Sequence, residues 1–114
     1  MSDCLFCRIA AGEIAADVVY QDDKVMAFKD VQPQAPFHVL VIPKRHLTSA
    51  FDLGPDDAAL LVRIFEVARN IAEADETVAG GVRILTNVGP QAGQVVMHLH
   101  FHVIGGRRLG WPPG

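Results

Sequence analysis

Three histidines near the C-terminal end alternate with apolar residues, in the stretch His-Leu-His-Phe-His-Val-Ile at 98–104. A repeat of two is typical of a half-buried β-strand, so we expect His98, His100 and His102 to share one face, with neighbours about 7 Å apart. Adjacent imidazolium charges repel each other, so at least some of these rings must stay neutral or meet an anion. The pattern leaves two interpretations open, a metal site or a histidine nucleophile that attacks phosphate.

Two cysteines, Cys4 and Cys7, stand in a C-x-x-C spacing. In a reducing compartment this spacing indicates metal binding, redox chemistry or chance. A thioredoxin-like motif would follow a strand inside a βαβ unit, whereas this pair opens the chain, which favours metal binding over redox chemistry. The pair supplies two of the four ligands that a structural zinc ion takes.

The elements that must position these groups form an α+β pattern. Apolar residues recur at helical spacing over 55–76, and a shorter helix is expected over 5–11, ended by Gly12. About five strands, one long helix and one short helix fit an antiparallel sheet with helices packed against it. Runs rich in β-branched and aromatic residues, separated by short turns, predict the strands at 18–21, 24–29, 37–42, 82–87 and 98–104.

Length and charge limit the classes of function. With 114 residues, 50% of them hydrophobic and 20% charged, the chain is expected to form one domain over 1–114 around a single core. The net charge of −3 argues against nucleic acid or an anionic membrane as a partner. No apolar run approaches the ~20 residues of a transmembrane helix, and residues 1–7 lack the features of a signal peptide. We therefore expect a cytoplasmic protein.

The alternating histidine stretch resembles the signature of the histidine triad (HIT) superfamily. Two further stretches, Asp-Val-Gln-Pro-Gln-Ala-Pro-Phe-His-Val-Leu-Val-Ile-Pro-Lys-Arg-His at 30–46 and the final Trp-Pro-Pro-Gly, make the chain similar to the HINT branch of that superfamily from about Cys4 to Gly114. The resemblance implies the HIT-like fold and a homodimer. A homodimer also suits Trp111, because a tryptophan in a tail rich in proline and glycine is expected to lie in a groove, for instance on another subunit.

The resemblance implies a purine nucleoside phosphoramidate hydrolase that works through a nucleotidyl-histidine intermediate and uses no cofactor for catalysis. His100 would attack the α-phosphate, and water would then release a nucleoside monophosphate such as AMP. His38 would orient His100 through its other ring nitrogen, while His102, Gln94 and the amides of 93–96 would donate to phosphate oxygens. The implied catalytic residues are His38, His98, His100 and His102.

The same resemblance implies a nucleotide-binding surface. Asp30 would accept hydrogen bonds from the ribose hydroxyls, although an ordinary turn residue is the alternative. The base would lie against five apolar residues that are otherwise expected in the core: Leu5, Phe6, Ile9, Phe28 and Val31. The phosphate would lie near Asn87, Gln94, Val95, His100 and His102. Val95 departs from the pattern, since many eukaryotic HINT proteins carry a serine there, close to the leaving group.

A structural zinc ion is implied as well. Some members of the branch, mainly bacterial, bind zinc through an N-terminal C-x-x-C pair, the histidine after Pro-Lys-x and the first triad histidine. In this chain those residues are Cys4, Cys7, His46 and His98.

Three other functions stay open at this stage. One is a dinucleoside polyphosphate hydrolase, and another is a nucleotide-binding regulatory protein with incidental hydrolysis. The third is a catalytic metal centre on the three triad histidines. The metal centre is the weakest of these, because no carboxylate lies near the histidines in sequence to orient them.

Overall fold

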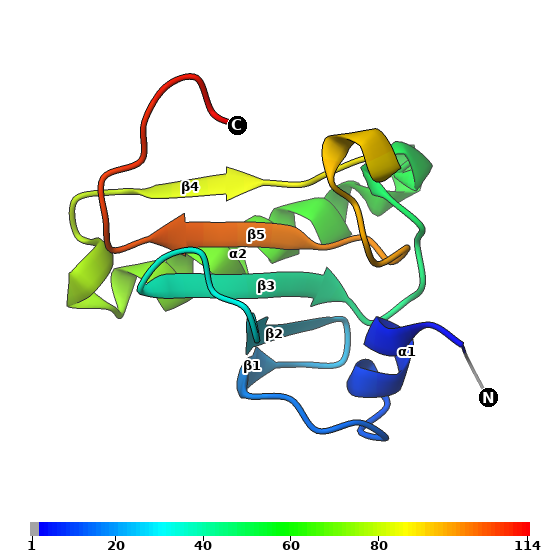
Figure 1. The fold of residues 1–114 in the computed structure, drawn as a ribbon. Coiled ribbons are helices and arrows are strands. Elements are labelled where there is room, and N and C mark those ends of the chain that lie inside the picture. The colour runs from blue at the N-terminus through cyan, green and yellow to red at the C-terminus, as the bar shows by residue number, and fades with distance from the viewer. Residues whose placement is uncertain (1–2) are drawn as a thin grey trace.

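Over residues 3–114, which the computed structural model describes, five antiparallel strands form one sheet in the order β1-β2-β3-β5-β4 (Figure 1). Met1 and Ser2, the first residues of the expected domain 1–114, lie outside the described residues. This is the predicted α+β architecture, and no helix in the described part is long and apolar enough to span a membrane. The strands are β1 (Val18–Gln21), β2 (Val25–Lys29), β3 (Phe37–Pro43), β4 (Val82–Leu85) and β5 (Phe101–Gly105).

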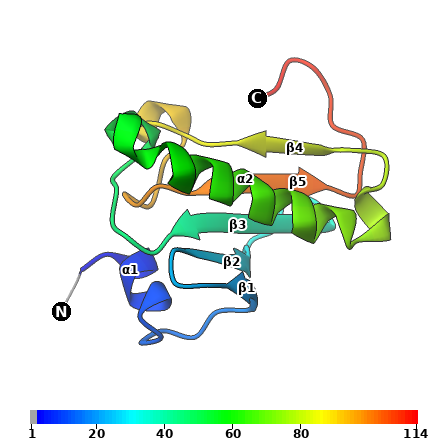
Figure 2. The same cartoon turned by 180° about the vertical axis from the view of Figure 1, so that it is seen from behind.

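The two faces of the sheet carry two separate apolar clusters. Successive side chains of a strand point to opposite faces, so Val39 and Val41 of β3 pack toward the long helix α2 (Ala58–Glu73), which crosses one face (Figure 2). Leu40 and Ile42 pack toward the short helix α1 (Leu5–Ala10) on the other face. All seven residues of β3 are buried, because this central strand is covered on both sides. His38 and His102 consequently lie on the α1 face.

The long helix is shorter than the predicted range 55–76 at both ends. Pro55–Asp57 form a 3₁₀ turn before it, in which the Asp57 carboxylate accepts the Gly54 N–H at 2.9 Å. After Glu73, the Asp75 carboxylate caps a second 3₁₀ turn by accepting the N–H of Thr77. Local side-chain hydrogen bonds therefore compete with the helix at each end.

The histidine stretch enters the sheet later than predicted. Regular pairing begins at Phe101 and not at His98, because loop contacts hold the preceding backbone. The Leu99 N–H donates to the Leu47 carbonyl at 2.6 Å, and the Thr86 hydroxyl donates to the His100 carbonyl at 2.7 Å. The alternation of faces nevertheless continues into the residues before β5, since Leu99 belongs to the cluster under α2.

The N-terminal helix α1 has six residues and begins after Cys4, whose sulfur accepts the N–H of Cys7 at 3.3 Å. It ends one residue earlier than the predicted range 5–11, and Gly12 follows with a φ of +79°. Phe6 and Ile9 are its buried side chains. The helix thus brings two cysteines and an apolar wall to the same end of the sheet.

Candidate functional site

A pocket of about 400 Å³ opens on the α1 face of the sheet. Its walls come from α1, the end of β2, β3, the loop before the histidine stretch, and β5. Every predicted nucleotide-binding residue except Gln94 lines it, namely Leu5, Phe6, Ile9, Phe28, Asp30, Val31, Asn87, Val95, His100 and His102. The structure therefore brings together side chains that are up to 97 positions apart in the chain, from Leu5 to His102.

Sequence reasoning missed part of the pocket wall. The additional lining residues are Ala15, Ala16, Lys29, Gln32 and Leu40, whereas Gly93 and Val96, which also line the pocket, belong to the 93–96 loop that was expected near the phosphate. The strand period could have identified Leu40, because it stands two residues after His38 and shares its face. Ala15 and Ala16 lie in an irregular segment, where no periodic signal indicates which side a small residue faces.

His100 is held in the tautomer that a nucleophile needs. Its Nδ1 lies 2.7 Å from the backbone carbonyl oxygen of His98. A carbonyl oxygen only accepts, so Nδ1 carries the proton and Nε2 keeps its lone pair. The imidazole is buried against the edge of the Phe6 ring, with ring centroids 5.1 Å apart.

The predicted contact from His38 to His100 was wrong. The Nε2 of His38 lies 2.9 Å from the Nδ1 of His102. The strand register explains this, because His38 pairs with Ile104 and Leu40 pairs with His102, so His102 is the nearest histidine on that face. His100 is therefore oriented by the His98 carbonyl.

A chain of hydrogen bonds assigns the protons on His38 and His102. The backbone N–H of Gln34 donates to His38 Nδ1 at 3.0 Å, so the proton of a neutral His38 sits on Nε2. That Nε2–H donates to His102 Nδ1, which leaves the proton of His102 on its own Nε2. Asp30 reinforces this tautomer of His38, since its carboxylate lies 3.3 Å from the same Nε2.

Burial keeps both of these rings neutral. Desolvation lowers the pKa of His38, and the negative Asp30 offsets part of that effect. Desolvation, followed by the neighbouring rings of His100 and His38, lowers the pKa of His102 to about 4. At pH 7 these side chains therefore act as hydrogen-bond donors and acceptors without charge.

Asp30, His38 and His102 lie close enough to suggest a metal site, but their protons argue against one. A metal bound by His38 Nε2 would push the proton to Nδ1, where the Gln34 N–H already donates. The N–H of Gln34 and the Nδ1–H of His38 would then be two donors facing each other, with no acceptor between them. This cluster is better described as a hydrogen-bonded relay.

Gln94 does not take the role that was expected of it. Its side chain is buried, and its amide nitrogen donates to the carbonyls of Thr48 at 2.7 Å and Val96 at 3.2 Å. Its amide oxygen accepts the N–H of Gly89 at 2.8 Å. The amide is therefore fully used inside the loop, and the expectation that it donates to a phosphate oxygen is not met. Gln94 instead fixes the backbone that carries Val95.

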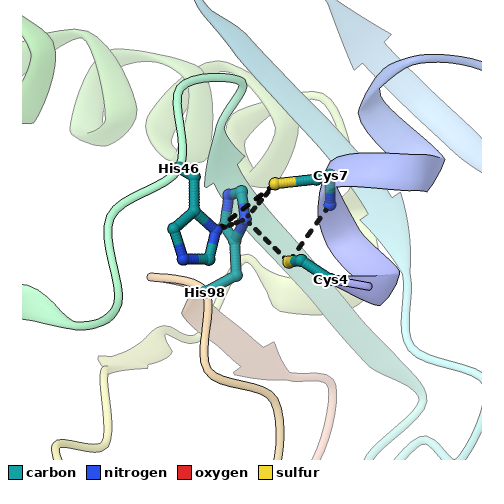
Figure 3. Close-up of side chains that lie close together, drawn as sticks. All are labelled: Cys4, Cys7, His46 and His98. Carbon is teal, nitrogen blue, oxygen red and sulfur yellow. Dashed lines mark hydrogen bonds between the residues drawn. The ribbon is translucent and has the colours of Figure 1, made fainter. Parts of the chain in front are cut away.

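A second group of side chains lies beside the pocket, where α1 meets the loop after β3 (Figure 3). It consists of the four predicted metal ligands, Cys4, Cys7, His46 and His98. The Nδ1 of His98 lies 3.3 Å from the Cys4 sulfur and 3.4 Å from the Cys7 sulfur. The Nδ1 of His46 lies 3.3 Å from the Cys7 sulfur and 3.2 Å from the Nδ1 of His98.

These four residues fit a tetrahedral metal ion. Bonds of about 2.3 Å to sulfur and about 2.0–2.1 Å to nitrogen place tetrahedral ligand atoms roughly 3.3–3.8 Å apart, close to the distances found here. His98 Nε2 donates to the Pro43 carbonyl at 2.8 Å, which leaves the Nδ1 lone pair directed at the two sulfurs. Burial lowers the pKa of His98, which favours the neutral ring that a metal requires.

Comparison with known proteins identifies a common family. Residues 11–109 match the HIT domain. The sequence is 46% identical over 112 residues to an uncharacterised HIT-like protein of Synechococcus elongatus, covering 98% of this chain and 97% of that protein. It is 45% identical over 114 residues to the 14 kDa zinc-binding protein of Brassica juncea, covering 98% of this chain and 100% of that protein.

A solved structure has the same fold. The crystal structure of a HIT family hydrolase from Legionella pneumophila superimposes with a TM-score of 0.95 at 46% sequence identity. The match covers 98% of this chain and 100% of the Legionella chain. The similarity therefore includes α1 and the C-terminal segment as well as the sheet.

Proposed function

This chain belongs to the HIT domain family, and we propose that it is a purine nucleoside phosphoramidate hydrolase of the HINT branch. The observation that carries the proposal is the His100 tautomer, with an unprotonated Nε2 in a pocket of nucleotide size. The hydrolase from Legionella, which is similar over its whole length, supports a hydrolytic reaction.

The proposed reaction has two displacements at phosphorus. The Nε2 of His100 attacks the α-phosphorus, an N–P bond to His100 forms, and the P–N bond to the amine breaks as the amine takes up a proton from solvent. Water then attacks the same phosphorus, a P–O bond forms, the bond to His100 breaks, and the proton lost by the water returns to solvent. The products are a nucleoside monophosphate and free His100. The Nε2–H of His102 donates to a phosphate oxygen as negative charge develops.

We propose that the Asp30 carboxylate binds the ribose of the nucleotide. Its Oδ1 accepts the N–H of Gln32 at 2.8 Å, which fixes the carboxylate at the edge of the pocket. Ribose hydroxyls are donors that a carboxylate accepts well. The purine ring then lies on the apolar wall formed by Phe6, Ile9 and Phe28.

Asp30→Asn is expected to weaken AMP binding about tenfold. Asparagine keeps an oxygen for the Gln32 N–H but removes the charge, and a hydrogen bond to a charged group contributes about 1.5–3 kcal/mol. Calorimetric titration of wild type and variant with AMP measures the loss. The 2′,3′-dideoxy analogue serves as the control, because it should bind both proteins equally. If the analogue loses as much affinity as AMP, Asp30 does not contact the sugar.

Val95→Ser is expected to speed the cleavage of substrates with poor amine leaving groups. Val95 is 87% exposed at the pocket edge, so the substitution adds a hydroxyl without disturbing packing. One additional hydrogen bond to the leaving group corresponds to roughly threefold to tenfold in rate. The rates are measured across a series of amines, with Val95→Ala as the matched control. Identical leaving-group dependence in all three proteins would rule out a role for this position.

The four residues beside the pocket are proposed to hold a structural zinc ion. Cys₂His₂ sets with all four positions filled by protein are typical of closed structural sites. The similarity to the zinc-binding protein of Brassica juncea supports this metal. When bound, zinc would neutralise the two thiolates and fix the four side chains around one centre.

The proposal includes a homodimer. β4 is an edge strand, and a groove of about 870 Å³ runs between it and α2, where Val62 and Phe65 are exposed. Trp111 is 85% exposed in the single chain. Burying these apolar groups in a second copy would be favourable. Light scattering on the protein as it elutes from a size-exclusion column should give a mass twice that of the 12.4 kDa chain.

Substrate competition tests the proposed reaction. The assay follows amine release from an adenosine 5′-phosphoramidate that carries a fluorescent amine, with a dinucleoside polyphosphate as competitor. Rapid amine release with weak competition supports the proposal. Cleavage of the polyphosphate alone would make the protein a polyphosphate hydrolase. Binding of AMP without cleavage of either substrate would make it a nucleotide-binding regulator.

A further inference from the structure

We propose that metal binding at Cys4, Cys7, His46 and His98 and nucleotide binding in the pocket are energetically coupled through α1. The inference rests on the proposed function, and it adds a role that a structural metal alone does not have. Cys4 and Cys7 become positioning residues for the nucleotide. The two sites share one short helix, and each site fixes that helix from a different side.

The first argument is that α1 belongs to both sites. Cys4 and Cys7, at its N-cap and in its first turns, supply two of the four metal-ligand atoms. Leu5, Phe6 and Ile9 of the same helix line the nucleotide pocket. Because the helix has only six residues, a shift that separates the sulfurs from His46 and His98 also moves the pocket wall.

The second argument concerns what holds α1 in place. Isolated helices shorter than about 12–15 residues are marginal in water, so a helix of six residues depends on its surroundings. Besides bonds to the adjacent residues 11–13, the hydrogen bonds of α1 and its N-cap to distant parts of the fold include those between the two cysteine sulfurs and His46 and His98. A further attachment is apolar, through the burial of Phe6 and Ile9.

The third argument is a direct contact between the two sites. The Phe6 ring meets His98, a metal-ligand residue, at a centroid distance of 6.0 Å and the nucleophile His100 at 5.1 Å, in both cases edge to face. It also meets Phe28 of the base pocket at 5.4 Å. A change in the position of α1 therefore reaches both the nucleophile and the base pocket.

The core on the opposite face of the sheet contains no residue of α1. Its buried residues come from β2, β3, β5 and α2, together with Val78 and Leu99. Loss of the metal is therefore expected to loosen α1 and the pocket while the sheet stays folded. Because the sheet stays folded, a change in AMP affinity after metal removal reports on the position of α1.

Coupling between two sites is reciprocal. If metal binding raises the affinity for AMP by some factor, AMP must raise the affinity for the metal by the same factor. Coupling factors of about 5–150 are typical. We expect about tenfold here, because the apolar contacts of Phe6 and Ile9 still dock α1 when the metal is absent.

The test uses the wild-type protein in its Zn²⁺-loaded form and after removal of the metal by a chelator. Calorimetry should give about tenfold weaker AMP binding for the stripped protein, and full recovery after Zn²⁺ is added back. Competition with a chromophoric chelator should give about tenfold tighter Zn²⁺ binding at saturating AMP. Cys7→Ala is the matched control: chelator should leave its AMP affinity unchanged.

Each outcome has a defined meaning. Equal AMP affinity with and without Zn²⁺ overturns the coupling but leaves the proposed function intact. Failure of the Zn²⁺-loaded protein to bind AMP overturns the proposed function itself. Loss of the β-sheet signal in circular dichroism after stripping also overturns the coupling, because the metal would then support the whole fold and not the position of α1.

Discussion

His100→Ala is expected to lower the turnover of a nucleoside phosphoramidate by at least about 10³-fold while the protein still binds AMP. The variant lacks the side chain that attacks phosphorus in the first step of the proposed reaction, and losses of this size follow removal of a nucleophile in other enzymes. Steady-state rates with a fluorescent-amine substrate measure the loss, and AMP titration checks that the pocket survives.

A paired variant separates chemistry from packing at this position. His100→Gly leaves space for an added imidazole, which can attack phosphorus in place of the missing side chain. Recovery of amine release with rising imidazole concentration would identify position 100 as the source of the nucleophile. His102→Ala provides the comparison, since losing a donor to phosphate typically costs about 10²–10³-fold and imidazole should not restore it. If His100→Ala keeps a tenth of wild-type turnover, His100 is not the nucleophile.

Cys7→Ala is expected to abolish stable Zn²⁺ binding and to lower the melting temperature. Three remaining ligands leave the tetrahedral set open. A ligand present at about a thousand times its Kd stabilises the folded state by about 4 kcal/mol. For a domain of this size that corresponds to about 15 °C in the melting temperature.

Elemental analysis and thermal unfolding in Zn²⁺-containing buffer test this second prediction. Arg8→Ala is the matched control, because Arg8 lies on the same helix and its guanidinium pairs with the partly exposed Glu13. The control should keep one zinc per chain and a melting temperature within a few degrees of wild type. A Cys7→Ala protein with undiminished zinc content would contradict the assigned ligand set.

The alternation of apolar and polar residues predicted which face of the sheet a side chain occupies better than it predicted which side chains contact each other. The alternation of apolar and polar residues places His102 on one face of the sheet, opposite Phe101 and Val103. Which histidine meets which depends on the strand register, and the pairing of β3 with β5 puts His38 beside His102. Sequence patterns alone do not fix the register between residues that are 64 positions apart in the chain.

Loop geometry was the second feature that could not be predicted from the sequence. The role of Gln94 depends on a turn in which Gly89 has a φ of 89° and Gly93 a φ of 98°, and the turn folds the amide inward. Glycine indicates that such backbone is allowed, but it does not specify which side chain the loop encloses. His46, a predicted metal ligand, lies 39 positions from Cys7, and only the resemblance to the HIT superfamily connected the two.

The central claim is that His100 forms a covalent bond to the nucleotide during turnover. The most direct test is to denature the wild-type protein at alkaline pH while it turns over an adenosine phosphoramidate, and to locate any adenylyl group by mass spectrometry of peptides. We predict an adenylyl group on His100 that disappears in His100→Ala. An adenylyl group on His38 or His102, or the same modified peptide from the variant, would contradict the proposed mechanism.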